Sequence, residues 1–130
     1  MWFNLRYYND ASNEYTKDIT FNIEQMEKIL GIPNQVDFNI VLTHNPIYFK
    51  TYAEWGADLT LSGHMHGGII RMPFIGGLLS PKREFFPKYD AGIFQLNNNN
   101  LIVNRGLGSE GRIIRIFNSP EISVITLKNK

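Results

Sequence analysis

The first regular hydrophobic pattern along the chain lies in the stretch "FNIEQMEKILG" and has the spacing of a helix. Its apolar positions fall on one helical face: Ile23, Met26, Ile29 and Leu30. Acidic residues come early in the stretch and Lys28 comes late, as the helix dipole favours. Gly31, with Pro33 just beyond it, supplies the stop signal. The pattern therefore predicts a helix that ends at Gly31.

The next stretch has the pattern of a strand, a helix and a second strand. The residues "DFNIVLTH" are β-branched, aromatic and nearly continuous in apolar character, which predicts a strand covered on both faces and ending at His44. The residues "YFKTYAEWG" predict a short helix that Gly56 closes. The residues "ADLTLSG" predict a second strand that ends where His64 begins.

The second half of the chain is mostly β in character. Turn residues separate its short strand candidates, which are "GGIIRM", "GIFQLN", "LIVN", "IIRIF" and "EISVITLK". The run "GLGSEG" at 106–111 matches the dinucleotide motif G-x-G-x-x-G, but β-branched residues follow where a helix is needed, so we interpret it as a loop. No repeat or internal linker divides the chain. We expect one domain, residues 1–130, of the α/β class with mixed α+β character.

Composition and charge narrow the classes of function. The chain has 13 Lys and Arg against 12 Asp and Glu and no basic cluster, so it offers no electrostatic footprint for nucleic acid. It has no cysteine, so any metal is held by imidazole, carboxylate, amide or water. No apolar run has the roughly 18 residues of a membrane span, and the start lacks the pattern of a signal peptide. We expect a soluble, cytoplasmic protein.

All 3 histidines lie at the ends of predicted strands or just after them. Ligands usually sit at the carboxyl ends of strands in α/β sheets, so His44 and His64 can converge there. If the run "GHMHGG" is extended, His64 and His66 face one side at roughly 6–7 Å, which suits two ions about 3.5–4 Å apart better than one. The neighbouring glycines permit sharp backbone turns. The alternative is a purely structural role for these histidines.

Four stretches together resemble the C-terminal half of a calcineurin-like metallophosphoesterase: "VLTHNP", "GADLTLSGHMHGGIIRMPFIGGLLSP", "VNRGLG" and "IRIFNSPEISVITL". The resemblance runs from about residue 37 to residue 127 and is closest to the bacterial membrane-associated, manganese-dependent subgroup. It implies part of a β-sandwich flanked by helices, with a two-metal site that hydrolyses phosphate esters or diphosphates. It also implies that His44 and His64 bind one ion and His66 the other. The implied metal is Mn²⁺, with Fe, Zn or Ni as alternatives.

The N-terminal motifs of this family have no counterpart in the sequence. The family has a D-x-H pair, a G-D motif and a G-N-H-[DE] motif that carries the catalytic histidine, whereas no histidine precedes His44 here. We therefore assign no catalytic residue and hypothesise that the chain is the C-terminal part of a larger enzyme, either a truncated gene product or a cut portion. The alternative is a non-catalytic remnant that binds at most one transition metal, since three neutral imidazoles suit Zn²⁺, Ni²⁺ or Cu²⁺ better than Mn²⁺.

Two further residues are candidates for substrate binding. Asn45 has the chemistry to bind a phosphoryl oxygen, and its alternative role is to stabilise the turn before Pro46. Arg105 follows a strand and can bind a substrate phosphate through two parallel hydrogen bonds, the alternative being an ordinary surface arginine. The substrate that the resemblance implies is a phosphorylated compound, with a lipid-linked one as a narrower alternative.

The stretch "RMPFIGGLLSPKREFFPKYDAG" mixes apolar and basic side chains. One interpretation is an apolar lip with a basic rim, suited to a lipid-linked phosphate or to peripheral membrane contact by the larger protein. Packing in the core is the ordinary explanation, and we favour it. A partial sandwich also exposes the edges of its sheets, which predicts homo-oligomerisation through them.

Overall fold

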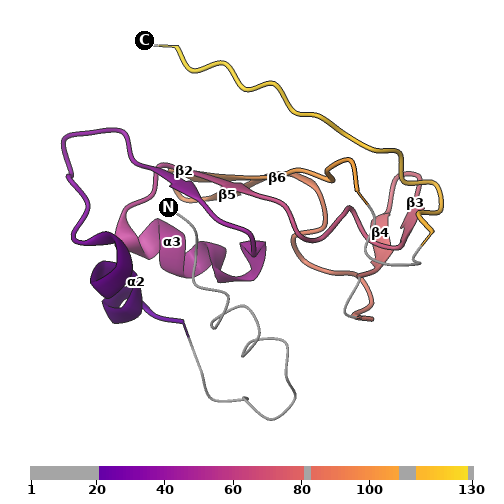
Figure 1. Cartoon of the computed structure of the whole chain (residues 1–130), viewed down its shortest axis with the longest axis horizontal. Helices are drawn as coiled ribbons and strands as arrows, with labels where there is room; N and C mark the ends of the chain where they lie inside the picture. The colour runs from indigo at the N-terminus through magenta and orange to yellow at the C-terminus, as the bar shows by residue number, and fades with distance from the viewer. Residues whose placement is uncertain (1–20, 81–82, 109–113, 129–130) are drawn as a thin grey trace.

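The structure is a computed structural model, and it describes residues 21–80, 83–108 and 114–128. Figure 1 shows a four-stranded sheet with helices α2 and α3 against one face and the β3–β4 hairpin at the far end. The C-terminal residues run back from the hairpin as extended chain, on the side of the sheet away from these helices. No described helix is long and apolar enough to cross a membrane.

Helix α2 spans Ile23–Leu30 and has the ends that its sequence predicts. The Asn22 side chain accepts a hydrogen bond from the Gln25 backbone N–H, and the Gln25 side chain accepts one from the Asn22 N–H, which completes a capping box. Gly31 ends the helix at a φ of +81°, a backbone angle that favours glycine. The helix buries Met26 against the rest of the protein.

Helix α3 (Phe49–Trp55) begins directly after a 3₁₀ turn, η1 (Pro46–Tyr48). Gly56 closes α3 in the left-handed conformation, as the sequence predicts. The helix packs against α2 and buries Phe49 and Tyr52. Since η1 starts two residues after His44, the packing of α3 also fixes the loop that carries this histidine.

The main sheet has the strand order β1-β2-β6-β5. Strand β1 (Ile40–Leu42) is parallel to β2 (Leu59–Ser62), and β2 is parallel to β6 (Asn99–Val103). Strand β5 (Gly92–Leu96) is antiparallel to β6 and joins it through a tight turn at Asn97, where φ is +54°. The three parallel strands therefore end at one edge of the sheet, where ligands usually bind in α/β folds.

Helices α2 and α3 cover one face of this sheet. Two clusters form the core there: Phe21, Met26, Val41, Tyr52 and Ala57 in the first, and Phe49, Met65, Leu101 and Val103 in the second. On the opposite face Ile40, Leu42 and Ile93 are exposed. The expectation that the strand before His44 is covered on both faces is therefore wrong for the described part of the chain, because no described helix covers that side.

The β3–β4 hairpin is separate from the main sheet. Strand β3 (Ile70–Met72) pairs antiparallel with β4 (Gly76–Leu79), and a parallel bridge from Ile70 to Ile116 ties the hairpin to a later segment. The sequence predicts β3 but not the glycine-rich β4. Of the strand expected at 113–117, residue 113 lies outside the described residues and the rest forms only the bridge at Ile116. The strand expected at 121–128 is wrong, because these residues are extended without a ladder partner in the described chain.

These elements confirm the α/β class. Parallel and antiparallel pairing occur in one sheet, and β1, α3 and β2 form the predicted strand, helix and strand. The run at 106–111 has no helix after it in the described residues, although residues 109–111 lie outside them. The single domain over 1–130 stays a prediction.

Candidate metal site

His44 follows β1 in a loop that hydrogen bonds hold at both of its neighbours. The Tyr52 hydroxyl donates to the backbone oxygen of Asn45 at 3.0 Å and lies 3.0 Å from the Thr43 hydroxyl. The Ser62 hydroxyl donates to the backbone oxygen of His44 at 3.0 Å. Helix α3 and the end of β2 therefore position His44 from two sides.

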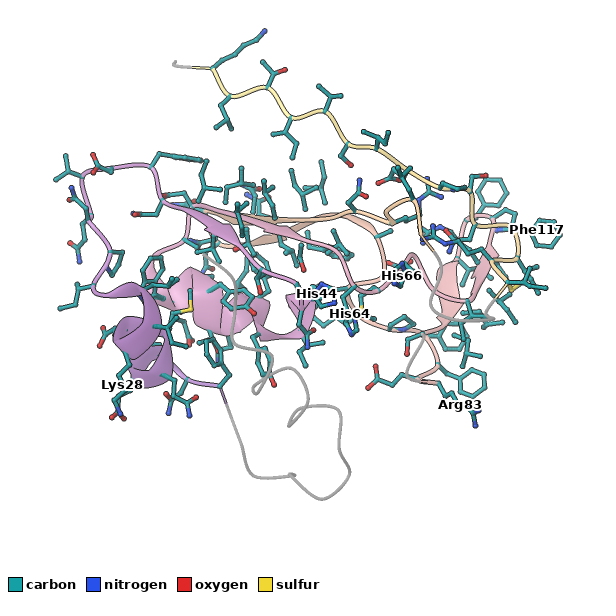
Figure 2. All side chains as sticks on the ribbon, viewed as in Figure 1. Lys28, His44, His64, His66, Arg83 and Phe117 are labelled. Atoms are coloured by element: carbon teal, nitrogen blue, oxygen red, sulfur yellow. The ribbon has the colours of Figure 1, made fainter. Side chains whose placement is uncertain are left out.

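His64 lies directly beside His44, as the strand ends predict (Figure 2). The centroids of the two imidazole rings are 4.6 Å apart, and the rings are tilted by 46°. Desolvation lowers the pKa of His44, and the charge of nearby His66 when protonated lowers it further. His64 is buried, whereas His44 is exposed. A lowered pKa favours the neutral imidazole, which is the form that binds metal ions.

The loop that carries His64 and His66 is tightly turned rather than extended. Left-handed φ angles occur at His64 (+66°), His66 (+50°), Gly67 (+71°) and Gly68 (+88°). The Gly68 N–H donates to the Met65 backbone oxygen at 2.8 Å, and the Met65 side chain enters the core. The extended conformation considered for this run is therefore wrong. Left-handed angles at non-glycine residues cost about 1–3 kcal/mol each and often mark functional sites.

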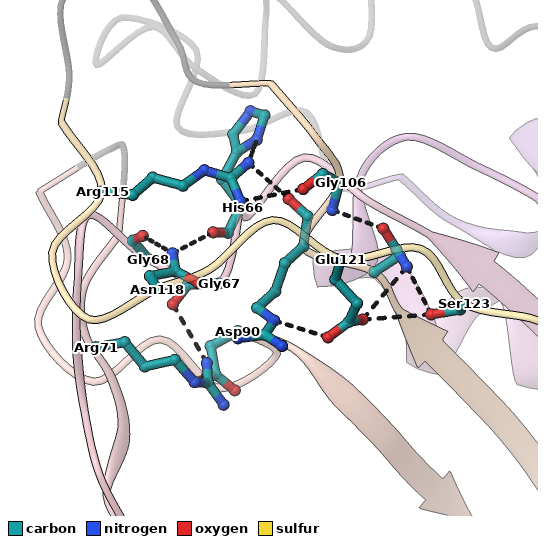
Figure 3. Close-up of polar contacts among 12 residues, drawn as sticks. His66, Gly67, Gly68, Arg71, Asp90, Gly106, Arg115, Asn118, Glu121 and Ser123 are labelled. Carbon is teal, nitrogen blue, oxygen red and sulfur yellow. Dashed lines mark hydrogen bonds and ion pairs between the residues drawn. The ribbon is translucent and has the colours of Figure 1, made fainter.

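Asn118 holds this loop from the C-terminal part of the chain. Its Nδ2 donates to the backbone oxygens of His66 and Gly68, each at 2.6 Å (Figure 3). A Cβ atom at Gly67 would lie 2.7 Å from Asn118 Oδ1 and 2.7 Å from Arg105 Cγ. Position 67 therefore requires glycine for close packing as well as for its backbone angle.

His66 lies against the guanidinium of Arg115 (Figure 3). Arg115 Nη2 is 3.1 Å from His66 Nδ1, donates to the Arg105 backbone oxygen at 2.8 Å, and also donates to the Gly108 backbone oxygen. Arg115 Nη1 donates to the Gly106 backbone oxygen at 3.1 Å. Because a guanidinium has only donors, His66 Nδ1 is the acceptor in this contact. Arg115 therefore joins the loop of residues 63–69, the histidine loop, to the loop after β6.

The side chains at the site fit a metal ion in part. The adjacent rings of His44 and His64 offer two imidazoles, a ligand that suits divalent transition metals. Among the residues that the structure describes, no three His, Asp or Glu side chains are grouped closely enough to hold one ion. The described chain thus assembles a pair of histidines, and the assignment of His66 to a second ion stays a prediction.

The two candidate substrate-binding residues both have structural contacts. Asn45 Oδ1 accepts a hydrogen bond from the Ile47 N–H at 3.2 Å and caps η1, as its alternative turn role requires. Asn45 Nδ2 is buried and has no hydrogen-bond partner among the described residues. Arg105 Nε donates to Glu121 Oε2 at 2.7 Å, so Arg105 is more than an ordinary surface arginine. Substrate binding by either residue stays a prediction.

Sequence reasoning missed three residues that support the site: Tyr52, Arg115 and Asn118. Tyr52 lies on a predicted helix and Arg115 in a predicted strand, where each has an ordinary structural interpretation. The contacts of Arg115 and Asn118 with His66 join segments 49 and 52 residues apart, whereas Tyr52 contacts Thr43 and Asn45, which are 9 and 7 residues away. No local pattern in the sequence carries a signal for such contacts.

Two histidines that follow neighbouring parallel strands of an α/β sheet are typical of a metal-binding α/β protein. Comparison with known proteins identifies its family. The chain is 38% identical over 92 residues to YkuE, an uncharacterised metallophosphoesterase of Bacillus subtilis, a match covering 71% of this chain and 32% of YkuE. It is 32% identical over 88 residues to the phosphodiesterase YaeI of Escherichia coli, covering 68% of this chain and 32% of YaeI. The chain belongs to the metallophosphoesterase family.

A third relative carries a more specific name. The UDP-2,3-diacylglucosamine pyrophosphatase LpxG of Chlamydia muridarum is 35% identical over 94 residues, covering 66% of this chain and 28% of LpxG. The chain thus spans about a third of the length of these relatives. No family model and no solved structure matches it. The relatives confirm the metallophosphoesterase resemblance and imply divalent metal ions in general, while the subgroup and the metal stay predictions.

Proposed function

We propose that this chain supplies His44, His64 and His66 as ligands to the two-metal site of a phosphoesterase that hydrolyses phosphate esters or diphosphates. The observation that carries the proposal is the contact between the His44 and His64 rings after parallel strands, in a member of the metallophosphoesterase family. His44 and His64 hold one ion, and His66 holds the other. No residue of this chain is assigned as the catalytic acid or base.

We propose Mn²⁺ as the metal of the intact enzyme, with Fe, Zn or Ni as alternatives. Two such ions supply charge stabilisation at the phosphoryl group and activation of water. The part played by this chain is to position ligands. Tyr52 and Ser62 fix the loop of His44, while Asn118 and Arg115 fix the loop of His66.

The substrate in this proposal is a phosphorylated compound. Arg105 has guanidinium N–H groups beyond the Nε that binds Glu121, and these are donors for a phosphoryl oxygen. Asn45 Nδ2 is a further donor without a partner in the described chain, and its burial means that a phosphoryl oxygen reaches it only if the loop after His44 moves. The relative LpxG, whose name specifies UDP-2,3-diacylglucosamine, supports a lipid-linked substrate. For such a substrate we propose a cytoplasmic enzyme with peripheral contact to the membrane.

A second candidate is a non-catalytic remnant that folds and binds at most one transition metal. The observation that favours it is that no three His, Asp or Glu side chains are grouped closely enough to hold an ion among the described residues. Of the three histidines, only His44 and His64 have adjacent rings. Two imidazoles with water in the remaining positions suit Zn²⁺ or Ni²⁺.

Hydrolysis of an aryl phosphodiester and an aryl phosphomonoester with Mn²⁺ tests the first candidate. For the purified chain alone we expect no turnover. We expect turnover when the N-terminal part of a relative such as YkuE is added, and loss of that turnover in His64→Ala. Turnover by the chain alone that disappears in His64→Ala would show that the site is complete without another chain. Absence of turnover in every mixture would support the remnant.

Metal titration separates the two candidates without catalysis. Co²⁺ absorption spectra of the chain report the number of ions bound and the ligand type. The remnant predicts one ion, lost in His44→Ala and in His64→Ala but retained in His66→Ala. The two-metal proposal predicts that His66→Ala weakens a second binding event once the N-terminal part of the relative is present.

A further inference from the structure

A cavity of about 480 Å³ opens at the end of the molecule that carries the β3–β4 hairpin. Arginine and aspartate side chains line one part of it, and large apolar side chains line the other. It adjoins the histidine loop, because Arg71 Nη1 donates to the Gly67 backbone oxygen at 3.3 Å and the Arg105 side chain packs on Gly67. A ligand in this cavity therefore lies next to the residues that follow His66.

The polar part of the cavity contains two anchored guanidiniums. Arg71 Nη1 lies 2.7 Å from Asp90 Oδ2, and Arg105 Nε lies 2.7 Å from Glu121 Oε2 (Figure 3). Each carboxylate contacts a single nitrogen of its arginine, so each arginine keeps N–H donors on its other nitrogens. The charged side chains that line the cavity are Arg71, Arg105 and Asp90, and Glu121 is paired with Arg105, so the positive and negative charges are equal in number. The guanidinium N–H donors that these pairs leave free can bind an anionic group with several oxygens, such as a phosphate.

The apolar part of the cavity is exposed to solvent. Phe74 has a relative exposure of 109%, Phe117 of 83%, Ile75 of 60% and Met72 of 41%. Met72, Phe74 and Ile75 are therefore not core residues, contrary to the interpretation that we favoured for their stretch of the sequence. Figure 2 shows Phe117 at the hairpin end of the molecule, well away from the helices.

The two aromatic residues of the rim have unusual backbone angles. The φ angle is +69° at Phe74 and +53° at Phe117, in the left-handed region that bulky side chains rarely adopt. Strain of this kind persists where the surrounding structure imposes it, and it concentrates at ligand-binding sites. Both angles occur in residues that line one cavity but come from different segments of the chain.

We propose that this cavity binds an anionic amphiphile, with its phosphate on Arg71 and Arg105 and its apolar chain against Phe74 and Phe117. This amphiphile is the part of the substrate that lies away from the bond hydrolysed at the metal site. The assignment rests on the proposed phosphoesterase function. The binding itself requires no metal and no catalysis. The position of the cavity beside Gly67 places that portion next to the histidine loop.

Three probes test the chemistry of the cavity in calorimetric titrations of the metal-free chain: octyl phosphate below its micelle concentration, inorganic phosphate and octyl glucoside. We expect one octyl phosphate per chain, bound at least about tenfold more tightly than either other probe, because only it satisfies both parts of the cavity. Equal affinity for octyl phosphate and octyl glucoside, or for octyl phosphate and inorganic phosphate, would overturn the proposal.

Single substitutions test whether octyl phosphate binds in this cavity. Phe74→Ser should lower the octyl phosphate affinity toward that of inorganic phosphate, and Arg105→Gln should lower it toward that of octyl glucoside. Phe38→Ser is the matched control, because Phe38 is 60% exposed, precedes β1 and does not line the cavity. Unchanged affinity in Phe74→Ser would refute the site. This variant keeps the test decisive even if Arg105→Gln does not fold, since Phe74 is exposed.

Sedimentation with vesicles identifies the source of the amphiphile. Binding to anionic vesicles that is lost in Phe74→Ser supports a membrane lipid as the ligand. Binding to octyl phosphate without binding to vesicles supports a soluble ester.

These binding measurements do not depend on the proposed hydrolysis. Octyl phosphate binding without turnover in any mixture would contradict the phosphoesterase function alone, while turnover without octyl phosphate binding would contradict only the cavity assignment.

Discussion

The hydrogen bond between Arg115 and His66 determines how His66 can bind a metal ion. Arg115 Nη2 carries two N–H groups but has three acceptors within reach, of which His66 Nδ1 at 3.1 Å is one. An ion on Nδ1 would take the lone pair that Arg115 uses. An ion on the other ring nitrogen would require a proton on Nδ1, facing the guanidinium. In either case metal binding by His66 breaks its contact with Arg115.

Removal of the Arg115 guanidinium should therefore tighten metal binding that involves His66. In the presence of the N-terminal part of a relative such as YkuE, we expect Arg115→Met to bind its second Zn²⁺ about tenfold more tightly than the unmodified chain, since a hydrogen bond to a charged group contributes about 1.5–3 kcal/mol. Arg105→Met is the control, because it removes an equal charge nearby without removing the His66 contact. Calorimetry measures both affinities. Equal effects of the two substitutions, or an effect that persists with His66→Ala, would contradict the competition.

The close packing at Gly67 gives a second prediction for single residues. Gly67→Ala should lower the free energy of unfolding by about 1–2 kcal/mol for the left-handed angle and by about 1–3 kcal/mol more for the contacts with Asn118 and Arg105. Gly106→Ala is a matched control, because φ there is +67° and no atom lies within 4 Å of the added Cβ. Urea unfolding measures both. Equal losses would show that Asn118 and Arg105 move aside at little cost.

At the scale of elements, the Arg105–Glu121 pair fastens the extended C-terminal segment to the loop after β6. Partial burial raises the pKa of Glu121, but the hydrogen bond and charge of Arg105 outweigh it and lower that pKa below the usual 4.5. The folded protein therefore holds this proton less tightly than the unfolded chain does. The stabilisation is present above about pH 4.5 and is lost as the pH falls further.

Glu121→Gln should therefore reduce the acid sensitivity of the protein. We expect the unmodified chain to lose about 1 kcal/mol more stability than Glu121→Gln between pH 7 and pH 3.5, a modest value because the pair is partly exposed. Glu24→Gln, which breaks an exposed helical pair with Lys28, is the control and should follow the unmodified chain. Urea unfolding across the pH range gives the comparison. Identical pH profiles for Glu121→Gln and the unmodified chain would rule out this linkage.

Elements with their own end signals were predictable from the sequence. Helices α2 and α3 end at Gly31 and Gly56 as predicted, and strands β1 and β2 lie directly before the histidine loops. Strand β4 was missed because its glycines hide the alternation of a strand, and the C-terminal strand was wrong because extended residues need a partner to form a ladder. Pairing depends on the rest of the molecule, so local patterns do not determine it.

The site was predictable in part for the same reason. The position of His44 and His64 after neighbouring strands follows from topology, and their rings do meet. The orientation of His66 depends on left-handed backbone angles and on Arg115, which no pattern in "GHMHGG" specifies. Strand ends therefore locate a site, whereas contacts between distant segments orient its side chains.

At the scale of the whole molecule, the two edge strands of the main sheet and their exposed apolar side chains predict self-association. Leu42 and Ile93, on the edge strands β1 and β5, have relative exposures of 60% and 74%. Apolar edge strands readily pair with another chain. We expect the mass from light scattering to rise with concentration, and the double variant Leu42→Lys, Ile93→Lys to stay monomeric. Val36→Lys, at an exposed apolar residue outside the strands, is the control. A constant monomer mass for the unmodified chain would exclude this association.

The parallel pairing of β2 with β6 has a consequence for the order of folding. The β5–β6 hairpin joins residues close in sequence, whereas the β2–β6 pairing encloses the histidine loop, β3, β4 and β5. Closing such a long loop is entropically unfavourable and slows folding. The hairpin should therefore form early and the β2–β6 pairing late, so the contacts of His66 with Arg115 and Asn118, which follow β6 in the chain, should appear in the last step of sheet assembly.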